Sequence, residues 1–212
     1  VKRRQIHLKE DLFRLNKTIM EVYFDGLKKQ DIGKTPMQYL KKRGITDDTI
    51  EQFRLGFSPN NWDTIVKVLK DRKISKNIAI QSGLILERKQ NNGYYDRFRN
   101  RIMFPIFDVN MQVAGFGGRV MDDSMPKYMN SPDTPVYNKS RILYGLHAAK
   151  QYCRQEGCVY IVEGYFDFLS LYQNGIKNTV ASLGTALTSD HVRILKGYAS
   201  RMVLVFDSDT AG

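Results

Sequence analysis

The last quarter of the chain alternates short apolar runs with amphipathic stretches, and this alternation constrains the fold more than any other feature. The apolar runs lie at 158–162, 178–181 and 202–206, and helical stretches at 165–173 and 188–196 separate them. Each run is continuously apolar, which is typical of strands that are buried on both faces. The βαβαβ order therefore predicts a parallel sheet with helices packed against it.

Acidic residues follow two of these predicted strands. Glu163 comes directly after the first strand, and Asp207 and Asp209 come directly after the third. Ligands of parallel sheets bind at the carboxyl ends of the strands, so all three carboxylates are expected at one edge. They would repel one another without a cation between them, and Mg²⁺ or Mn²⁺ prefers oxygen ligands. Asp167, one helical turn beyond Glu163, either supports this site or stabilises the helix N-terminus.

The region before residue 158 has a different pattern, which predicts several helices followed by antiparallel strands. The predicted helices are 7–29, 35–43, 46–53, 62–71 and 75–82. Asn91, Asn92 and Gly93 form a hairpin-type turn signal. Residues 102–119 read as two strands that reverse near Asn110, and Pro105 predicts an edge position or a bulge in the first of them. The whole chain is thus expected to be α/β, with an α+β unit followed by a parallel sheet.

The positive charge is concentrated in the same first region. Of 33 basic and 22 acidic residues, residues 158–212 hold four and five, a net charge of −1. Residues 1–157 therefore hold 29 basic and 17 acidic residues, a net charge of +12. A balance of this size favours a polyanionic partner. In one extended strand, Arg97, Arg99 and Arg101 would share a face and form a phosphate-facing stripe.

Other classes of protein are disfavoured. No apolar run approaches the roughly 20 residues needed to span a membrane. The first residues, VKRRQIHLKED, lack the apolar stretch of a secretion signal. Cys153 and Cys158 are too few for a disulfide framework and fit no zinc pattern, so we expect reduced thiols in a cytoplasmic protein.

Two acidic motifs resemble the Toprim domain, which bacterial primases share with topoisomerases and some nucleases. They are EGxxD at 163–167 and DxDxAG at 207–212. Four upstream segments are similar to the basic subdomain of bacterial DNA primases. These segments are YDRFRNRIMFPIFD (95–108), GFGGRV (115–120), PKYMNSPDTPVYNKS (126–140) and LYGL (143–146). The resemblance covers essentially the whole chain, and it assigns 1–157 to the basic subdomain and 158–212 to a partial Toprim subdomain.

The resemblance implies a nucleotidyltransferase that makes short RNA primers on single-stranded DNA from ribonucleoside triphosphates. Glu163, Asp207 and Asp209 would be the catalytic metal ligands, with Glu163 alternatively a proton acceptor. The residues expected to contact nucleotide or template are Arg43, Arg97, Arg99, Arg119, Lys127, Tyr128, Asn130 and Lys139. Zinc is expected only in a preceding domain and the replicative helicase contact only in a following one.

Two features depart from the family pattern. Ser208 stands between Asp207 and Asp209, where the family has glycine, and a further acidic pair would follow beyond Gly212. We therefore expect a truncated core that is weak or inactive alone. Three alternatives remain open: another Toprim enzyme, a helicase–primase fusion or plasmid-type primase, and a non-catalytic module that binds single strands.

Overall fold

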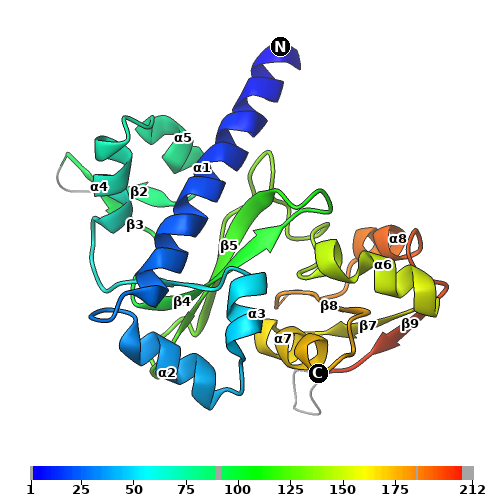
Figure 1. Cartoon of the computed structure of the whole chain (residues 1–212). Helices are drawn as coiled ribbons and strands as arrows, with labels where there is room; N and C mark the ends of the chain where they lie inside the picture. Colours follow the sequence, from blue (N-terminus) through cyan, green and yellow to red (C-terminus); the bar gives the residue numbers. More distant parts are fainter. Residues whose placement is uncertain (1, 89–91, 185, 207–212) are drawn as a thin grey trace.

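The computed structural model describes residues 2–88, 92–184 and 186–206 (Figure 1). An N-terminal unit is built on an antiparallel sheet, and a C-terminal unit on a parallel one. Among these residues, no helix is long and apolar enough to cross a membrane. The α/β class and the order of the two sheets are as the sequence predicts.

Eight helices occur in the described part of the chain. They are α1 (Lys2–Lys28), α2 (Lys34–Lys42), α3 (Asp47–Gln52), α4 (Thr64–Asp71), α5 (Lys76–Gln81), α6 (Leu146–Glu156), α7 (Tyr165–Gln173) and α8 (Ser189–Leu195). Seven of them correspond to predicted helices, and most of their first and last residues lie within a few positions of the predicted ones. Helix α6, which lies between Gly145 at φ +81° and Gly157 at φ +61°, was not predicted.

The N-terminal sheet has the order β1-β4-β5-β6, all antiparallel. Its strands are β1 (Gly56–Ser58), β4 (Arg101–Phe107), β5 (Val113–Val120) and β6 (Tyr128–Asn130). The pairing of β1 with β4 ends at Met103, and the β4–β5 register shifts between Ile106 and Phe107. Pro105 therefore lies past the end of β1 and beside a bulge, where its missing N–H costs no ladder hydrogen bond.

Helix α1 crosses this sheet and contacts β1 and β5 (Figure 1). Its buried Asn16 donates to the carbonyls of Val113 and Ala114 at 3.0 and 2.9 Å. These bonds attach the helix to β5, the strand that carries Arg119. A separate hairpin is formed by β2 (Ile85–Glu87) and β3 (Tyr94–Asp96), as the turn signal predicts.

The C-terminal sheet is parallel and has the order β8-β7-β9. Its strands are β7 (Cys158–Val162), β8 (Thr179–Ala181) and β9 (Arg201–Leu204). Figure 1 shows α6 and α8 on one side of this sheet and α7 on the other. Buried side chains of α6, such as Ala149 and Cys153, pack in one cluster with Val159 and Ile161 of β7. The predicted boundary between the units at 157/158 remains a prediction. Helix α6 precedes that boundary in the chain but packs against the C-terminal sheet.

The two units share an aromatic core. Phe104 of β4 stacks on Tyr165 of α7 with ring centroids 4.4 Å apart. Phe53, just after α3, makes edge contacts with Phe168 and Tyr172 of α7 at 5.2 and 5.1 Å. These contacts fix the orientation of the C-terminal sheet edge relative to β5 and β6.

The same interface contains a half-buried histidine, His147, whose protonation should destabilise the fold. The ring of His147 in α6 lies 4.7 Å from the ring of Phe107. Burial, with Lys150 nearby, lowers the pKa of His147 from 6.5 to about 4. The unfolded chain therefore binds the extra proton first, and stability is lost as the pH falls from 6.5 towards 4.

We expect the wild type to lose about 2 kcal/mol more unfolding free energy than His147→Leu between neutral pH and about pH 4. This is less than the full shift implies, because the side chain is only partly buried. Urea titrations at several pH values measure the difference. The exposed His7→Leu variant is the control and should follow the wild type. Parallel pH profiles for the wild type and His147→Leu would contradict the assignment.

Candidate nucleotide and metal site

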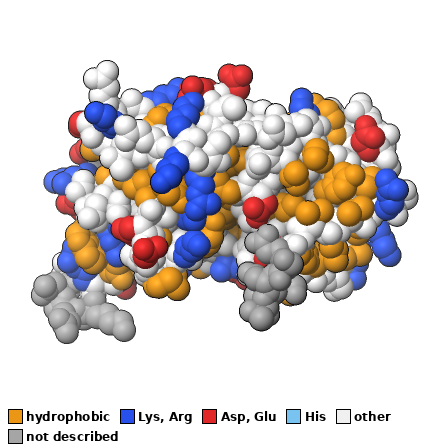
Figure 2. Space-filling view, turned by 90° about the horizontal axis from the view of Figure 1, so that it is seen from below, with side chains coloured by type: hydrophobic (Ala, Val, Ile, Leu, Met, Phe, Trp, Pro, Cys, Tyr) orange, Lys and Arg blue, Asp and Glu red, His pale blue; other side chains and the backbone are white. Residues whose placement is uncertain are grey.

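A cavity of about 390 Å³ lies between the two units at the carboxyl end of β7. It is lined by Arg43, Arg119, Lys127, Tyr128, Asn130, Glu163, Gly164, Tyr165, Phe166, Asp167, Leu183 and Gly184. Seven of these residues were candidates from the sequence, and they come from α2, β5, β6, α7 and the segments beside them. Figure 2 shows a run of Lys and Arg side chains with hydrophobic ones beside it on the underside of the molecule.

Aromatic rings hold the two arginines of this cavity. The Arg119 guanidinium carbon lies 5.1 Å from the ring centre of Phe166, 5.3 Å from Tyr128 and 5.4 Å from Tyr39. Arg119 also donates to the Tyr39 hydroxyl. The Arg43 guanidinium carbon lies 5.2 Å from the Phe166 ring and 5.5 Å from that of Tyr39. Cation–π contacts of this kind orient a guanidinium without neutralising it.

The charge of both arginines is left available for a ligand. Neither takes part in any ion pair among the described residues. Arg119 is only 4% exposed, and its Nε atom is buried without a hydrogen-bond partner in the described part of the chain. A buried cation in this state is suited to a phosphate, which accepts several charge-assisted hydrogen bonds.

Glu163 lines the same cavity as the two arginines. It follows β7 directly and is half-buried. Beside it, the Val205 N–H donates to the Ile161 carbonyl at 2.9 Å, so the chain after β9 runs along the end of β7. Asp207 and Asp209 lie outside the described residues. Within the described ranges, no group of three His, Cys, Asp or Glu residues can hold a metal ion.

Asp167 has a local partner. Its carboxylate accepts a hydrogen bond from the Gly164 N–H at 3.0 Å. This is the contact expected of an acidic residue in the first turn of a helix. Asp167 also lines the cavity and is exposed. This contact supports the interpretation that Asp167 stabilises the N-terminus of α7. A supporting role of Asp167 at the site remains a prediction.

The predicted arginine stripe is wrong. Residues 97–100 form a loop between β3 and β4, and Asn100 has φ +51°, so the three side chains do not share one extended strand. Arg101 opens β4, and its buried guanidinium donates to the Pro126 carbonyl at 2.8 Å. Burial lowers the pKa of Arg97. The alternation of charges in sequence did not reveal the turn that separates them.

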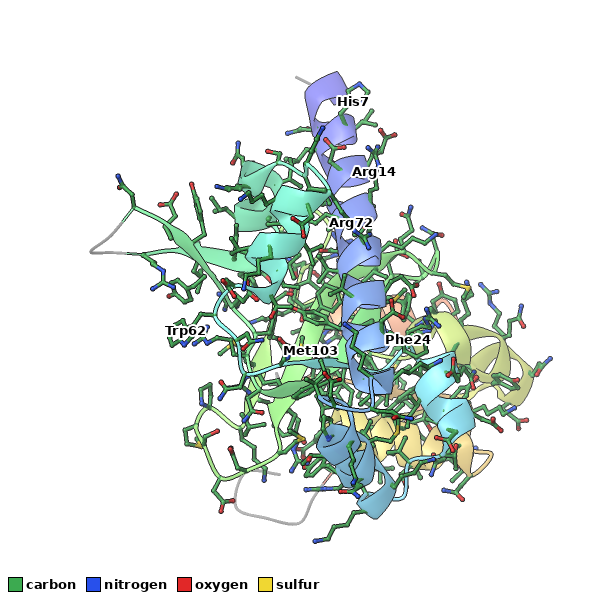
Figure 3. All side chains as sticks on the ribbon, turned by 60° about the vertical axis from the view of Figure 1, so that its left-hand side comes forward. His7, Arg14, Phe24, Trp62, Arg72 and Met103 are labelled. Carbon is green, nitrogen blue, oxygen red and sulfur yellow. The ribbon has the colours of Figure 1, made fainter. Side chains whose placement is uncertain are left out.

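Arg99 instead belongs to an exposed aromatic cluster that the sequence analysis missed. Its guanidinium carbon lies 4.0 Å from the ring centre of Trp62, which is 55% exposed. Tyr95 stands next to Trp62, with ring centroids 5.6 Å apart, and Arg88 approaches Trp62 at 5.9 Å. Figure 3 shows Trp62 on the outside of the molecule, near the β2–β3 hairpin. We refer to Trp62, Tyr95, Arg88 and Arg99 as the tryptophan cluster.

Two residues that contact the arginines were not predicted: Phe166, which lines the cavity, and Tyr39, which lies behind the arginines. One candidate lies elsewhere. Tyr39 is one helical turn before Arg43, and this spacing could have predicted that the two side chains meet. Phe166 lies within the EGxxD motif, which could have predicted its place at the site. Lys139 is not among the residues that line the cavity. Its carbonyl lies 3.1 Å from His191 Nε2, and its N–H donates to Asp133 at 3.0 Å.

Comparison with known proteins gives the same family for both units. Residues 23–150 match the family described as DNA primase catalytic core, N-terminal domain, and residues 157–212 match the Toprim domain. A DNA primase of Clostridium acetobutylicum is 43% identical over 203 residues, which cover 96% of this chain and 33% of that protein. The DNA primase of Escherichia coli is 38% identical over 206 residues, 97% of this chain and 35% of that protein. The chain thus spans about a third of these relatives.

Solved structures show the same similarity. A DnaG primase catalytic domain bound to ssDNA aligns with a TM-score of 0.89 at 38% identity, over 98% of this chain and 66% of that one. A DNA primase domain from Pseudomonas aeruginosa also aligns with a TM-score of 0.89, at 41% identity, over 95% of this chain and 63% of that one. The match over 23–150 lies in the region that separates primases from other Toprim enzymes.

Removal of the Phe166 ring should weaken the binding of phosphates in the cavity. Phe166→Leu takes away one ring contact from each of Arg43 and Arg119, and each such contact contributes about 0.5–2 kcal/mol. We expect the affinity for tripolyphosphate, measured by isothermal titration calorimetry at low salt, to fall about five-fold. Phe13→Leu on α1, a partly buried phenylalanine that does not line the cavity, is the control. Equal affinities for the two variants would refute the role of the ring.

Proposed function

The chain belongs to the family of bacterial DNA primase catalytic cores, and on that premise we propose that it is part of a DNA-directed RNA polymerase. This enzyme synthesises short RNA primers from ribonucleoside triphosphates on a single-stranded DNA template for replication. One observation carries the proposal: Arg43, Arg119 and Lys127 line the same cavity as Glu163. Basic side chains (the basic wall) and a carboxylate in one cavity are the groups that phosphoryl transfer needs, the former for phosphate charge and the latter for a metal ion.

The basic wall would bind the triphosphate. Phosphoryl transfer depends mainly on positioning and on neutralisation of developing negative charge. The aromatic contacts of Arg43 and Arg119 hold their guanidinium groups in place before a nucleotide arrives. Tyr128, 40% exposed, offers a ring on which a base or sugar can pack.

Glu163, Asp207 and Asp209 would hold the divalent metal, Mg²⁺ or Mn²⁺. Their oxygen atoms are the ligands that such hard cations prefer, and Glu163 lies at the correct edge of the sheet for this role. The metal supplies neutralisation of phosphate charge and activation of the attacking hydroxyl. Glu163 is alternatively the acceptor of the proton from that hydroxyl.

The tryptophan cluster would guide the template. It presents an exposed indole with guanidinium groups against it, and stacking plus phosphate attraction is how proteins hold single strands. A similar primase catalytic domain is bound to ssDNA, which supports a single-stranded template for this chain. We further propose a cytoplasmic enzyme that meets the replicative helicase through a separate domain.

Replacement of the predicted metal ligand should abolish synthesis without loss of template binding. In the full-length protein, Glu163→Gln removes a negative charge and keeps the shape of the side chain. We expect primer synthesis on a single-stranded template to fall at least about 100-fold, with unchanged DNA affinity. Asp190→Asn, which alters a partly exposed carboxylate paired with Arg193 on α8, is the control. Wild-type rates for Glu163→Gln would exclude the proposed role of this residue.

The tryptophan cluster gives a direct test of template binding, because Trp62 is the only tryptophan in the sequence. We expect single-stranded DNA to quench its fluorescence, and Trp62→Ala to weaken binding about ten-fold through the loss of base stacking. Arg99→Gln should make the slope of log affinity against log salt concentration shallower by about one, the contribution of one phosphate contact. Ile176→Ala, an exposed apolar residue on the C-terminal unit, is the control. Salt-independent binding would contradict an electrostatic template path.

A further inference from the structure

A ring of hydrogen bonds joins the two units beside the cavity. The Leu183 N–H donates to the Glu163 carbonyl at 3.1 Å, and the Leu183 carbonyl accepts from the Asn130 side-chain amide at 3.2 Å. The Asn130 side-chain oxygen accepts from the Tyr165 hydroxyl at 2.7 Å. Tyr165 stands two residues after Glu163, so the backbone closes the ring. The ring therefore connects β6 of the N-terminal unit with two segments of the C-terminal sheet edge.

The chemistry of the groups fixes the direction of each bond. A backbone carbonyl only accepts, so the amide nitrogen of Asn130 faces Leu183 and its oxygen faces Tyr165. The Tyr165 hydroxyl is then the donor. Burial raises the pKa of Tyr165 well above its ordinary value, so this hydroxyl keeps its proton at neutral pH.

Tyr165 is fixed by packing as well as by its hydroxyl. Its ring stacks on Phe104 at 4.4 Å and meets Tyr144 edge-on at 4.8 Å. Gly117, which pairs with Asn130 across β5 and β6, leaves space for the hydroxyl: a Cβ at this position would lie 1.9 Å from the Tyr165 oxygen. Removal of the hydroxyl alone would therefore keep the packing and break only the ring of hydrogen bonds.

The loop on the other side of the ring needs external support. Leu183 has φ +64°, a left-handed conformation that residues other than glycine rarely adopt. Its N–H and its carbonyl are both occupied by the ring, by Glu163 and Asn130 respectively. Loss of the Asn130 contact would leave Leu183 held on one side only.

We propose that Tyr165 is a positioning residue which, through Asn130 and Leu183, sets the separation between Glu163 and the basic wall of the cavity. The proposal rests on the proposed nucleotidyl-transfer function. A nucleotide that bridges Glu163 with its metal and the arginines must contact both walls at once. When the separation is already set, no binding free energy is needed to order the two walls. Loss of this preorganisation therefore weakens nucleotide binding more than it slows the chemical step.

The test compares two tyrosine-to-phenylalanine variants of the full-length protein. Tyr165→Phe removes the hydroxyl that donates to Asn130. Tyr144→Phe is the matched control, because its buried hydroxyl has no hydrogen-bond partner in the described part of the chain. We expect the KM for ribonucleoside triphosphates to rise about five-fold in Tyr165→Phe, the effect of one neutral hydrogen bond, with kcat changed less than about two-fold. Tyr144→Phe should keep the wild-type KM.

A second measurement needs no activity. Hydrogen–deuterium exchange of the nucleotide-free protein reports the Leu183 N–H directly, and we expect faster exchange at 182–184 in Tyr165→Phe than in Tyr144→Phe. If Tyr165→Phe keeps the wild-type KM and the wild-type exchange rate, the positioning role is wrong. The same holds if the variant is less thermally stable but its KM and its exchange rate are unchanged. Absence of ribonucleotide incorporation by the wild type would instead reject the proposed function, and the exchange data would still test the ring.

Discussion

The stack of Phe104 on Tyr165 is the contact on which the arrangement of the site depends. It joins the central strand pair of the antiparallel sheet to the helix that follows Glu163. Large rings buried at such an interface contribute both apolar area and directional contacts. Because Phe53 adds edge contacts to the same helix, the two units cannot rotate relative to each other without breaking several ring pairs. The cavity between them is thereby held open at a defined width.

Charge in the cavity is organised by aromatic side chains and not by ion pairs. Arg43 and Arg119 each lie against Phe166 and Tyr39, and no carboxylate pairs with them among the described residues. A salt bridge would also have oriented these side chains, but it would have compensated the charge that a triphosphate needs. The same principle recurs outside the cavity, where Arg99 lies over Trp62. In both places the ring orients a cation that stays available to an anionic ligand.

Particular elements show how far the sequence alone could lead. The helical and strand patterns predicted an antiparallel region followed by a parallel sheet. Pro105 predicted an edge position or a bulge in its own strand, but β4 lies between β1 and β5, and the extra residue of the nearby bulge is Ala114 of β5. The family resemblance named Glu163, Arg119 and Lys127 as site residues, and all three line one cavity. The stripe of Arg97, Arg99 and Arg101 failed, because a left-handed residue at Asn100 breaks the strand and alternation in sequence does not record φ angles. Helix α6 was not predicted, although its buried residues Leu146, Ala149 and Cys153 recur at helical spacing and a left-handed glycine lies at each of its ends.

The sequence by itself determined the parallel sheet, the position of Glu163 at its edge and the basic character of the first unit, since these follow from local periodicity and charge. Only the tertiary structure decided which cations face that edge. Spacing alone places Tyr39 near Arg43, but only packing placed Arg119 against Tyr39 and Phe166, and Arg99 against Trp62. The ring through Asn130, Tyr165 and Leu183 likewise unites residues far apart in the chain. Contacts of this kind depend on how two sheets meet, which no single stretch of sequence encodes.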